Sequence, residues 1–162
     1  MNILIYLSFY ALIIISVIGY SLMFQKVLRN TVDIEFEYNL LGVLLFLIFL
    51  SFLTHFFLNH GYAHNIIIFI IGIALFIFYF MNEKRISKIY FGYILLIFGI
   101  LAVGFFTSKT HDDFPYYHFP YTYYLVENKM VIGVGQFNHG FKTPSSIFYL
   151  NSLFYLPVIK YY

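Results

Sequence analysis

Four long apolar runs without a charged side chain constrain this chain more than any other feature. They extend over Ile3–Phe24, Leu40–Leu58, Tyr62–Met81 and Ile89–Phe106. A helix needs about 20 apolar residues to cross about 30 Å of hydrocarbon, and each run is close to that length. A backbone inside a bilayer must satisfy its own hydrogen bonds, so helices are the expected conformation. The sequence predicts an all-α membrane protein, with a four-helix transmembrane region over 1–106 (about 3–24, 40–58, 62–81 and 89–106).

The composition supports this class and excludes others. Only 10% of the residues are charged, whereas soluble domains carry about 25%. The net charge of +2, without a basic patch, gives no reason to expect a nucleic-acid partner. The chain has no cysteine, which excludes disulfides and thiolate chemistry. The first run lacks a basic start and a small-residue cleavage site, so it is expected to stay as a helix rather than be removed as a signal peptide.

The connections between the runs predict the orientation. Lys and Arg follow the first and third runs, whereas the short connection 59–61 has neither: the basic residues are Lys26, Arg29, Lys84, Arg85 and Lys88. Cytoplasmic loops carry the excess of Lys and Arg. The N-terminus and the segment 107–162 are therefore expected on the outer side of the membrane.

The outer segment 107–162 begins with an unusual cluster. His111–His118 holds two aspartates, two histidines and two tyrosines within eight residues, directly after the fourth run. Asp113 is a candidate N-cap with Pro115 in the first turn, which predicts an interfacial helix at about 114–125. Thr143 followed by Pro144 predicts a second short interfacial helix at about 144–156.

The cluster offers two interpretations. Asp112 and Asp113 are candidate catalytic bases, because a carboxylate within hydrogen-bond reach can deprotonate a hydroxyl group. Adjacent carboxylates also bind hard divalent cations, so Mg²⁺ or Mn²⁺ at Asp112 and Asp113 is the one cofactor to consider. The alternative is that one aspartate caps a helix and the other is a solvated charge. His118 is expected to form hydrogen bonds rather than to bind a metal.

Two further groups carry polar chemistry. In 135–146, glycines free the backbone, His139 and Lys142 offer positive charge and a helix N-terminus follows, so the segment is a candidate phosphate site. The alternative is an ordered loop with one solvated lysine. His55, His60 and His64 lie around the second connection, and a structural role is favoured over a metal site.

The outer segment resembles the first outer loop of GT-C-type membrane glycosyltransferases, in which an acidic motif with aromatic residues follows an apolar helix. It is also similar to a poorly characterised bacterial family of polytopic, GT-C-like proteins. The residues that carry the resemblance are Asp113-Phe114-Pro115-Tyr116-Tyr117-His118, Phe137-Asn138-His139-Gly140-Phe141 and Ser145-Ser146, within residues 90–156.

The resemblance implies a polyprenyl-phosphate-linked sugar donor used at the outer face of the membrane. Asp113 or Asp112 would then be the base. The substrate-binding residues would be Tyr117, His118, Asn138, His139 and Lys142. The chain is expected to be an N-terminal part of such an enzyme and inactive alone. The alternative function is a small non-enzymatic membrane protein whose outer segment binds a partner or lipid.

Overall fold

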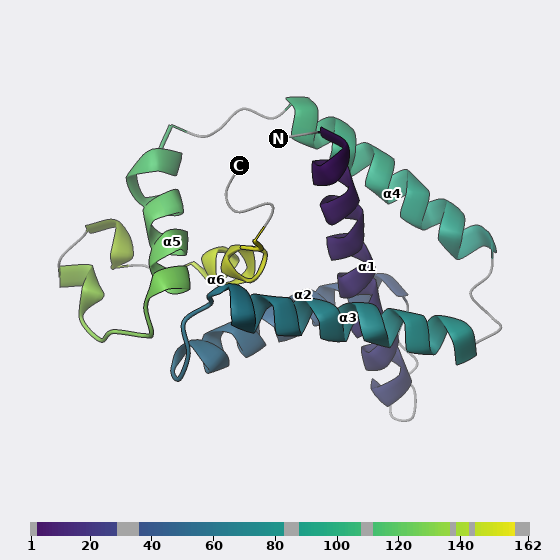
Figure 1. Cartoon of the computed structure of the whole chain (residues 1–162), viewed down its shortest axis with the longest axis horizontal. Helices are drawn as coiled ribbons and strands as arrows, with labels where there is room; N and C mark the ends of the chain where they lie inside the picture. Colours follow the sequence, from purple (N-terminus) through teal and green to yellow (C-terminus); the bar gives the residue numbers. More distant parts are fainter. Residues whose placement is uncertain are drawn as a thin grey trace.

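The structure is a computed structural model that describes residues 3–28, 36–82, 88–107, 112–136, 139–142 and 145–157. Within these ranges every regular element is a helix, which confirms the all-α prediction for this part of the chain (Figure 1). The longer helices are α1 (Ile3–Leu28), α2 (Phe36–His55), α3 (Tyr62–Asn82) and α4 (Lys88–Thr107). The shorter ones are η1 (Phe114–His118), α5 (Phe119–Glu127), η2 (Val134–Gln136), η3 (His139–Phe141) and α6 (Ser146–Leu153).

Two helices are long and apolar enough to cross a membrane when the described residues are considered. They are Ile5–Leu28 within α1 and Tyr62–Met81 within α3. The described apolar part of α2, Asn39–His55, is shorter. Helices α1 to α4 lie at the four apolar runs of the sequence, but a four-span topology goes beyond this finding and stays a prediction.

Helices α1 and α3 cross where Gly19 meets Gly72. A Cβ atom at Gly19 would collide with the carbonyl oxygen of Gly72, and a Cβ atom at Gly72 would lie 2.7 Å from the carbonyl oxygen of Ser16. Close backbone approach through small residues is typical of helix pairs in membranes. At the same crossing the Ser16 hydroxyl donates a hydrogen bond to the Phe69 carbonyl oxygen at 3.1 Å.

Helix α6 is buried against α2 and α5 rather than lying free on a surface (Figure 1). One apolar cluster joins α1, α2 and α6 through Tyr20, Val43, Leu47, Leu150 and Leu153. A second cluster joins α5 to α6 through Tyr121, Leu125, Phe148 and Tyr149. Helix α6 is therefore the element that connects the outer segment to the apolar helices.

Helix α6 starts at a different cap from the expected one. Ser145 is its N-cap, in an extended conformation, and the Ser145 hydroxyl accepts a hydrogen bond from the Ile147 N–H at 3.4 Å. Thr143 and Pro144, the expected start, lie outside the described residues. The helix ends at Leu153, three residues before the expected end.

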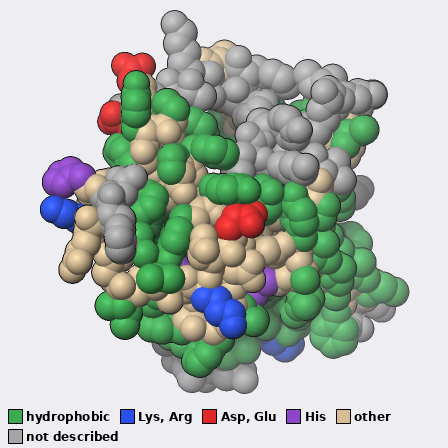
Figure 2. All heavy atoms as spheres, turned by 60° about the vertical axis from the view of Figure 1, so that its left-hand side comes forward, with side chains coloured by type: hydrophobic (Ala, Val, Ile, Leu, Met, Phe, Trp, Pro, Cys, Tyr) green, Lys and Arg blue, Asp and Glu red, His purple; other side chains and the backbone are tan. Residues whose placement is uncertain are grey.

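The outward surface is strongly apolar. On α2, the exposed residues Leu41, Leu45, Phe49 and Phe52 recur every three or four positions and so form one face of the helix. Figure 2 shows hydrophobic side chains over much of the face that it presents, with few charged groups among them. Exposed apolar surface of this extent is expected to be covered by lipid or protein.

Candidate functional site

The candidate site combines the carboxylates of Asp112 and Asp113 with the loop that holds His139 and Lys142. Its acidic part lies at the start of η1. Asp113 occupies the N-cap position, as the sequence predicts, but its side chain makes no capping hydrogen bond. The cap is made by the backbone instead, because the Asp113 carbonyl oxygen accepts from the N–H groups of Tyr116 (3.1 Å) and Tyr117 (3.2 Å). The side chains of Asp112 and Asp113 are exposed. The helix-capping interpretation of the Asp113 carboxylate is therefore wrong.

The helix changes its winding at two prolines. Pro115 and Pro120 have no N–H group, and the ring of Pro120 would clash with the carbonyl four residues earlier in a regular α-helix. Residues 114–118 form a single π-helical turn, and the Phe119 N–H donates to the Phe114 carbonyl oxygen. Wider turns of this kind are often found at functional sites. The change from π-helical to α-helical winding, at the boundary between η1 and α5, lies just before Pro120.

The end of η1 is fixed by stacking on α6. The rings of Tyr117 and His118 stack with their centroids 4.2 Å apart. The edge of the His118 ring meets the Phe148 ring at 5.1 Å. The His118 backbone carbonyl oxygen also accepts from the Thr122 hydroxyl at 2.8 Å. Tyr117 and His118, two of the predicted substrate-binding residues, are thus half-buried and held in place by aromatic contacts.

The basic end of the candidate site is the loop that contains η3. Phe141 packs against the ring of Tyr121, with the two centroids 4.9 Å apart. Gly135 lies against the backbone of Lys142, and a Cβ atom there would be 2.9 Å from the Lys142 Cα. His139 and Lys142 themselves are exposed. Gly135, one of the glycines of the candidate phosphate site, thus allows the loop to fold closely onto Lys142.

The structure brings the helical turns next to these two groups into contact. Helix η1, which follows Asp112 and Asp113, is in contact with η3, which carries His139 and leads to Lys142. The sequence separates these segments by more than 20 residues, so this contact is a property of the fold. His111 and Asn138, also part of the predicted site, lie outside the described residues. Among the described residues no three His, Asp or Glu side chains gather into a metal-binding group.

A buried polar group lies at the connection between α2 and α3, where the sequence places three histidines for which a structural role is expected. We call His55, His60, His64 and Asn65 the histidine cluster. The ring centroids of His55 and His60 are 5.1 Å apart, and the rings of His60 and His64 stack at 4.9 Å. The His55, His60 and Asn65 side chains are almost completely buried. The only signal in the sequence is three histidines close together at the end of an apolar helix.

Hydrogen bonds hold the His60 ring in place. Its Nε2 lies 3.0 Å from the Ser51 carbonyl oxygen, which can only accept, so Nε2 carries a hydrogen. Its Nδ1 lies 2.6 Å from the Ser152 hydroxyl group of α6, which also lies 2.8 Å from the Tyr149 carbonyl oxygen. The ring therefore links α2 to α6, two elements far apart in the chain.

The same connection also satisfies the end of α5. The last carbonyl groups of a helix have no partner within it. The His60 N–H donates to the Leu125 carbonyl oxygen at 2.9 Å, and the Asn59 side-chain amide donates to the Val126 carbonyl oxygen at 2.9 Å. The His55 Nε2 donates to the Asn128 carbonyl oxygen at 2.9 Å. The histidine cluster and its neighbour thus hold both α5 and α6, the two helices on which η1 and η3 rest.

The histidine cluster predicts a dependence of stability on pH. Burial, followed by the charges that His64 and His55 would carry, lowers the pKa of His60 from 6.5 to about 3. Between these values the unfolded chain binds a proton that the folded chain does not, so stability falls as the pH falls. We expect the melting temperature in detergent to be constant above about pH 7 and to decrease steadily below pH 6.5.

The control for this prediction is the exposed His139. His60→Gln should lower the melting temperature at neutral pH and make its decrease in acid shallower, whereas His139→Gln should leave the pH profile unchanged. Equal profiles for the wild type and His60→Gln would show that His60 does not govern acid stability.

Comparison of the chain with protein-family models, with curated proteins and with solved structures gives no match.

Proposed function

We propose that this chain forms the outer-face catalytic segment of a membrane glycosyltransferase of the GT-C type, with a polyprenyl-phosphate-linked sugar as donor. The observation that carries the proposal is the contact between η1 and η3. It places the segment that follows Asp112 and Asp113 beside the segment that holds His139 and Lys142. A carboxylate base close to cationic groups is the combination that sugar transfer from a phosphate carrier needs.

The proposed reaction assigns a role to each end of the site. The carboxylate of Asp112 or Asp113 removes the proton from the acceptor hydroxyl group. The hydroxyl oxygen then bonds to the anomeric carbon of the sugar, while the bond between that carbon and the phosphate oxygen breaks. The polyprenyl phosphate leaves with the bonding electron pair, and the Lys142 ammonium group and a hydrogen bond from the His139 ring stabilise it. Asp112 and Asp113 also have the oxygen ligands that Mg²⁺ or Mn²⁺ prefers.

The proposal includes the membrane arrangement. All four long helices span the bacterial plasma membrane, and the N-terminus and the segment 107–162 lie on its outer side. The aromatic surface of η1 supports this arrangement, since Phe114 and Tyr116 are exposed, and aromatic side chains are enriched at the membrane–water interface. A lipid-linked donor would approach the site from this side.

The test is the combined substitution Asp112→Asn and Asp113→Asn in the protein as the cell makes it. A neutral amide cannot accept the hydroxyl proton, so we expect transfer to fall by about 10²–10⁴-fold. The measurement is the amount of surface glycan or glycolipid in membranes of a deletion strain that carries the variant, determined by mass spectrometry.

Glu127→Gln is the matched control, because Glu127 is an exposed carboxylate at the other end of α5. It should leave the product unchanged, and both variants should reach the wild-type amount in the membrane. A product that survives the double substitution at the wild-type level would rule out the catalytic role. It would favour the non-enzymatic alternative, in which the outer segment binds a partner or lipid.

A further inference from the structure

Five apolar side chains are exposed together at the outer end of α2. Three of them follow the helix directly: Phe56 is 50% exposed, Phe57 69% and Leu58 51%. The other two lie in the loop after α5, where Val131 is 53% and Ile132 97% exposed. We call these five residues the apolar tip. An almost fully exposed isoleucine in an outer loop needs an explanation, because water is an unfavourable environment for it.

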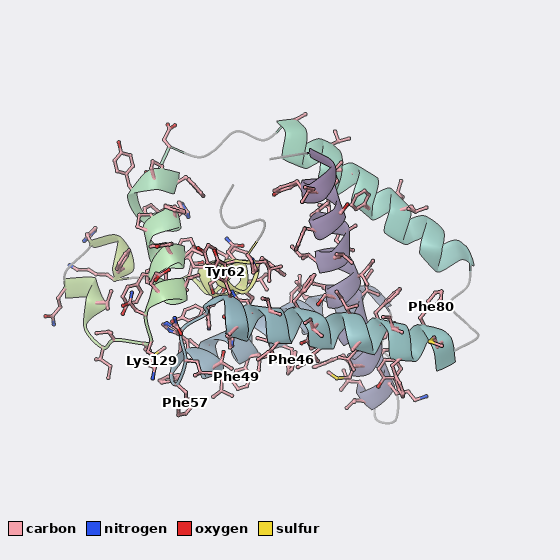
Figure 3. All side chains as sticks on the ribbon, in the orientation of Figure 1. Phe46, Phe49, Phe57, Tyr62, Phe80 and Lys129 are labelled. Carbon is pink, nitrogen blue, oxygen red and sulfur yellow. The ribbon has the colours of Figure 1, made fainter. Side chains whose placement is uncertain are left out.

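Two hydrogen bonds, one between backbone groups and one from a side chain, hold the two parts of the apolar tip beside each other. The Met130 N–H donates to the His55 carbonyl oxygen at 3.1 Å, and the His55 Nε2 donates to the Asn128 carbonyl oxygen at 2.9 Å. Phe56 and Val131 are the next residues along the two segments. Figure 3 shows Phe57 and Lys129 at the same end of the structure. The loop 128–132 is therefore fixed at the level of the last turn of α2.

The apolar tip continues a surface that faces away from the protein. The exposed face of α2, formed by Leu41, Leu45, Phe49 and Phe52, leads directly to Phe56 at the helix end. At 1.5 Å per residue, the 20 residues of α2 extend for about 30 Å, which is the thickness of the hydrocarbon core. If this face of α2 meets lipid, the apolar tip lies where the hydrocarbon gives way to the headgroups.

The chemistry of the surroundings favours lipid over a protein partner. Lys129 is exposed one residue before Met130 and beside the apolar tip. A lysine near a membrane surface keeps its alkyl stem in the apolar region and its ammonium group among the phosphates. Phenylalanines beside a lysine, at the end of an apolar helix, form the combination that anchors proteins at this boundary.

We propose that the apolar tip inserts into the outer leaflet of the membrane and that Lys129 binds the phosphate groups of phospholipids above it. This anchor fixes the depth of α5, η1 and η3 relative to the lipid surface, and so determines how a lipid-linked phosphate meets His139 and Lys142. The inference rests on the membrane arrangement of the proposed function and deepens it, because it assigns a lipid contact to the loop after α5.

Fluorescent labels at single cysteines test the proposal, and the absence of native cysteine makes every label unique. The protein is reconstituted into vesicles of phosphatidylethanolamine and phosphatidylglycerol, and an environment-sensitive fluorophore is attached to Ile132→Cys. The control labels are Gln136→Cys, exposed four residues later, and Ile70→Cys, which is 57% exposed on α3. Quenching is measured with phospholipids that carry a nitroxide on the acyl chain and with iodide in water.

We expect the Ile132 label to emit at shorter wavelength than the Gln136 label. Lipid nitroxide should remove most of the Ile132 emission, and iodide should have little effect on it. The Gln136 label should show the opposite behaviour. An Ile132 label quenched by iodide as strongly as the Gln136 label would overturn the anchor.

Two other results are informative. An Ile132 label protected from both quenchers would mean that protein covers the apolar tip, and this also overturns the proposal. The Ile70 label separates failure of the anchor from failure of the membrane arrangement. Strong lipid quenching at Ile70 without quenching at Ile132 removes only the anchor, whereas no lipid quenching at Ile70 removes the membrane arrangement on which both proposals rest.

Discussion

Gly72→Val is expected to separate α1 from α3 and to unfold much of the protein at temperatures that the wild type survives. A Cβ atom at Gly72 would lie 2.7 Å from the Ser16 carbonyl oxygen and 2.8 Å from the Tyr20 ring. The backbone of a helix cannot yield as a flexible side chain does, so α1 would have to move away. The movement would break the hydrogen bond from the Tyr20 hydroxyl to the Ile68 carbonyl oxygen, which is 2.7 Å long. We expect a loss of about 3 kcal/mol or more.

The matched control for this prediction is Gly99→Val in α4. A Cβ atom at Gly99 meets no described atom within 4 Å, although the residue also lies within a long apolar helix. The measurement is the melting temperature in detergent, followed by the fraction of protein that stays monodisperse after heating. Equal melting temperatures for Gly72→Val and Gly99→Val would show that the crossing of α1 and α3 does not determine stability.

Asn65→Ala is expected to release α6 from the start of α3. The side-chain NH2 group of Asn65 has two hydrogens and lies within hydrogen-bond distance of three carbonyl oxygens, those of His60 (2.7 Å), Ser152 (2.8 Å) and Tyr155 (2.9 Å), which share them. Ser152 and Tyr155 belong to the end of α6 and the residues after it, where few N–H donors of the helix remain, although the Ser152 oxygen also accepts from the Tyr155 N–H at 3.3 Å. A buried carbonyl that loses its donor costs about 1–3 kcal/mol, so we expect about 3 kcal/mol in total.

Release of α6 can be followed directly by thiol labelling. Leu153→Cys places a thiol in the buried cluster between α6 and α2, where Leu153 is 4% exposed. Adding Asn65→Ala should accelerate labelling of this thiol by a maleimide by more than about tenfold, since each tenfold change corresponds to 1.4 kcal/mol. Asn65→Asp should act in the same way, because a carboxylate of similar shape has no hydrogen to donate.

Asn151→Ala is the control, because Asn151 lies in the same helix and is exposed. It should not change the labelling rate. If Asn65→Ala and Asn151→Ala give the same rate, the hydrogen bonds of the Asn65 side-chain amide are not what keeps α6 in place.

The positions of the long helices follow from the sequence, because each is specified locally by an uninterrupted apolar run. The observed bounds Ile3–Leu28 and Tyr62–Asn82 differ from the expected 3–24 and 62–81 mainly at the C-terminal end of the first helix. The apolar run ends at Phe24, whereas the helix continues through the polar Gln25 and Lys26. The run alone therefore places the C-terminal end of this helix too early. The change of winding before Pro120 has an equally local cause, since it depends on the ring of one residue.

The parts of the candidate site are visible in the sequence, but their arrangement is not. Asp112, Asp113, His139 and Lys142 stand out because charged side chains are rare in this chain. The contact between the neighbouring turns η1 and η3 depends on aromatic packing such as that of Phe141 with Tyr121 and of Phe148 with His118. In a chain with 22 phenylalanines and 17 tyrosines, no pattern indicates which rings will meet.

What the sequence determined by itself is the helical class, the placement of the apolar helices and the concentration of polar chemistry after the fourth of them. Only the tertiary structure decided that Gly19 meets Gly72, that α6 is buried against α2, and that His60 joins Ser51 to Ser152. The physical reason is the separation along the chain over which each interaction acts. Apolar runs, caps and proline breaks act over a few residues, whereas a hydrogen bond such as that between His60 and Ser152, 92 residues apart, exists only once the helices have packed.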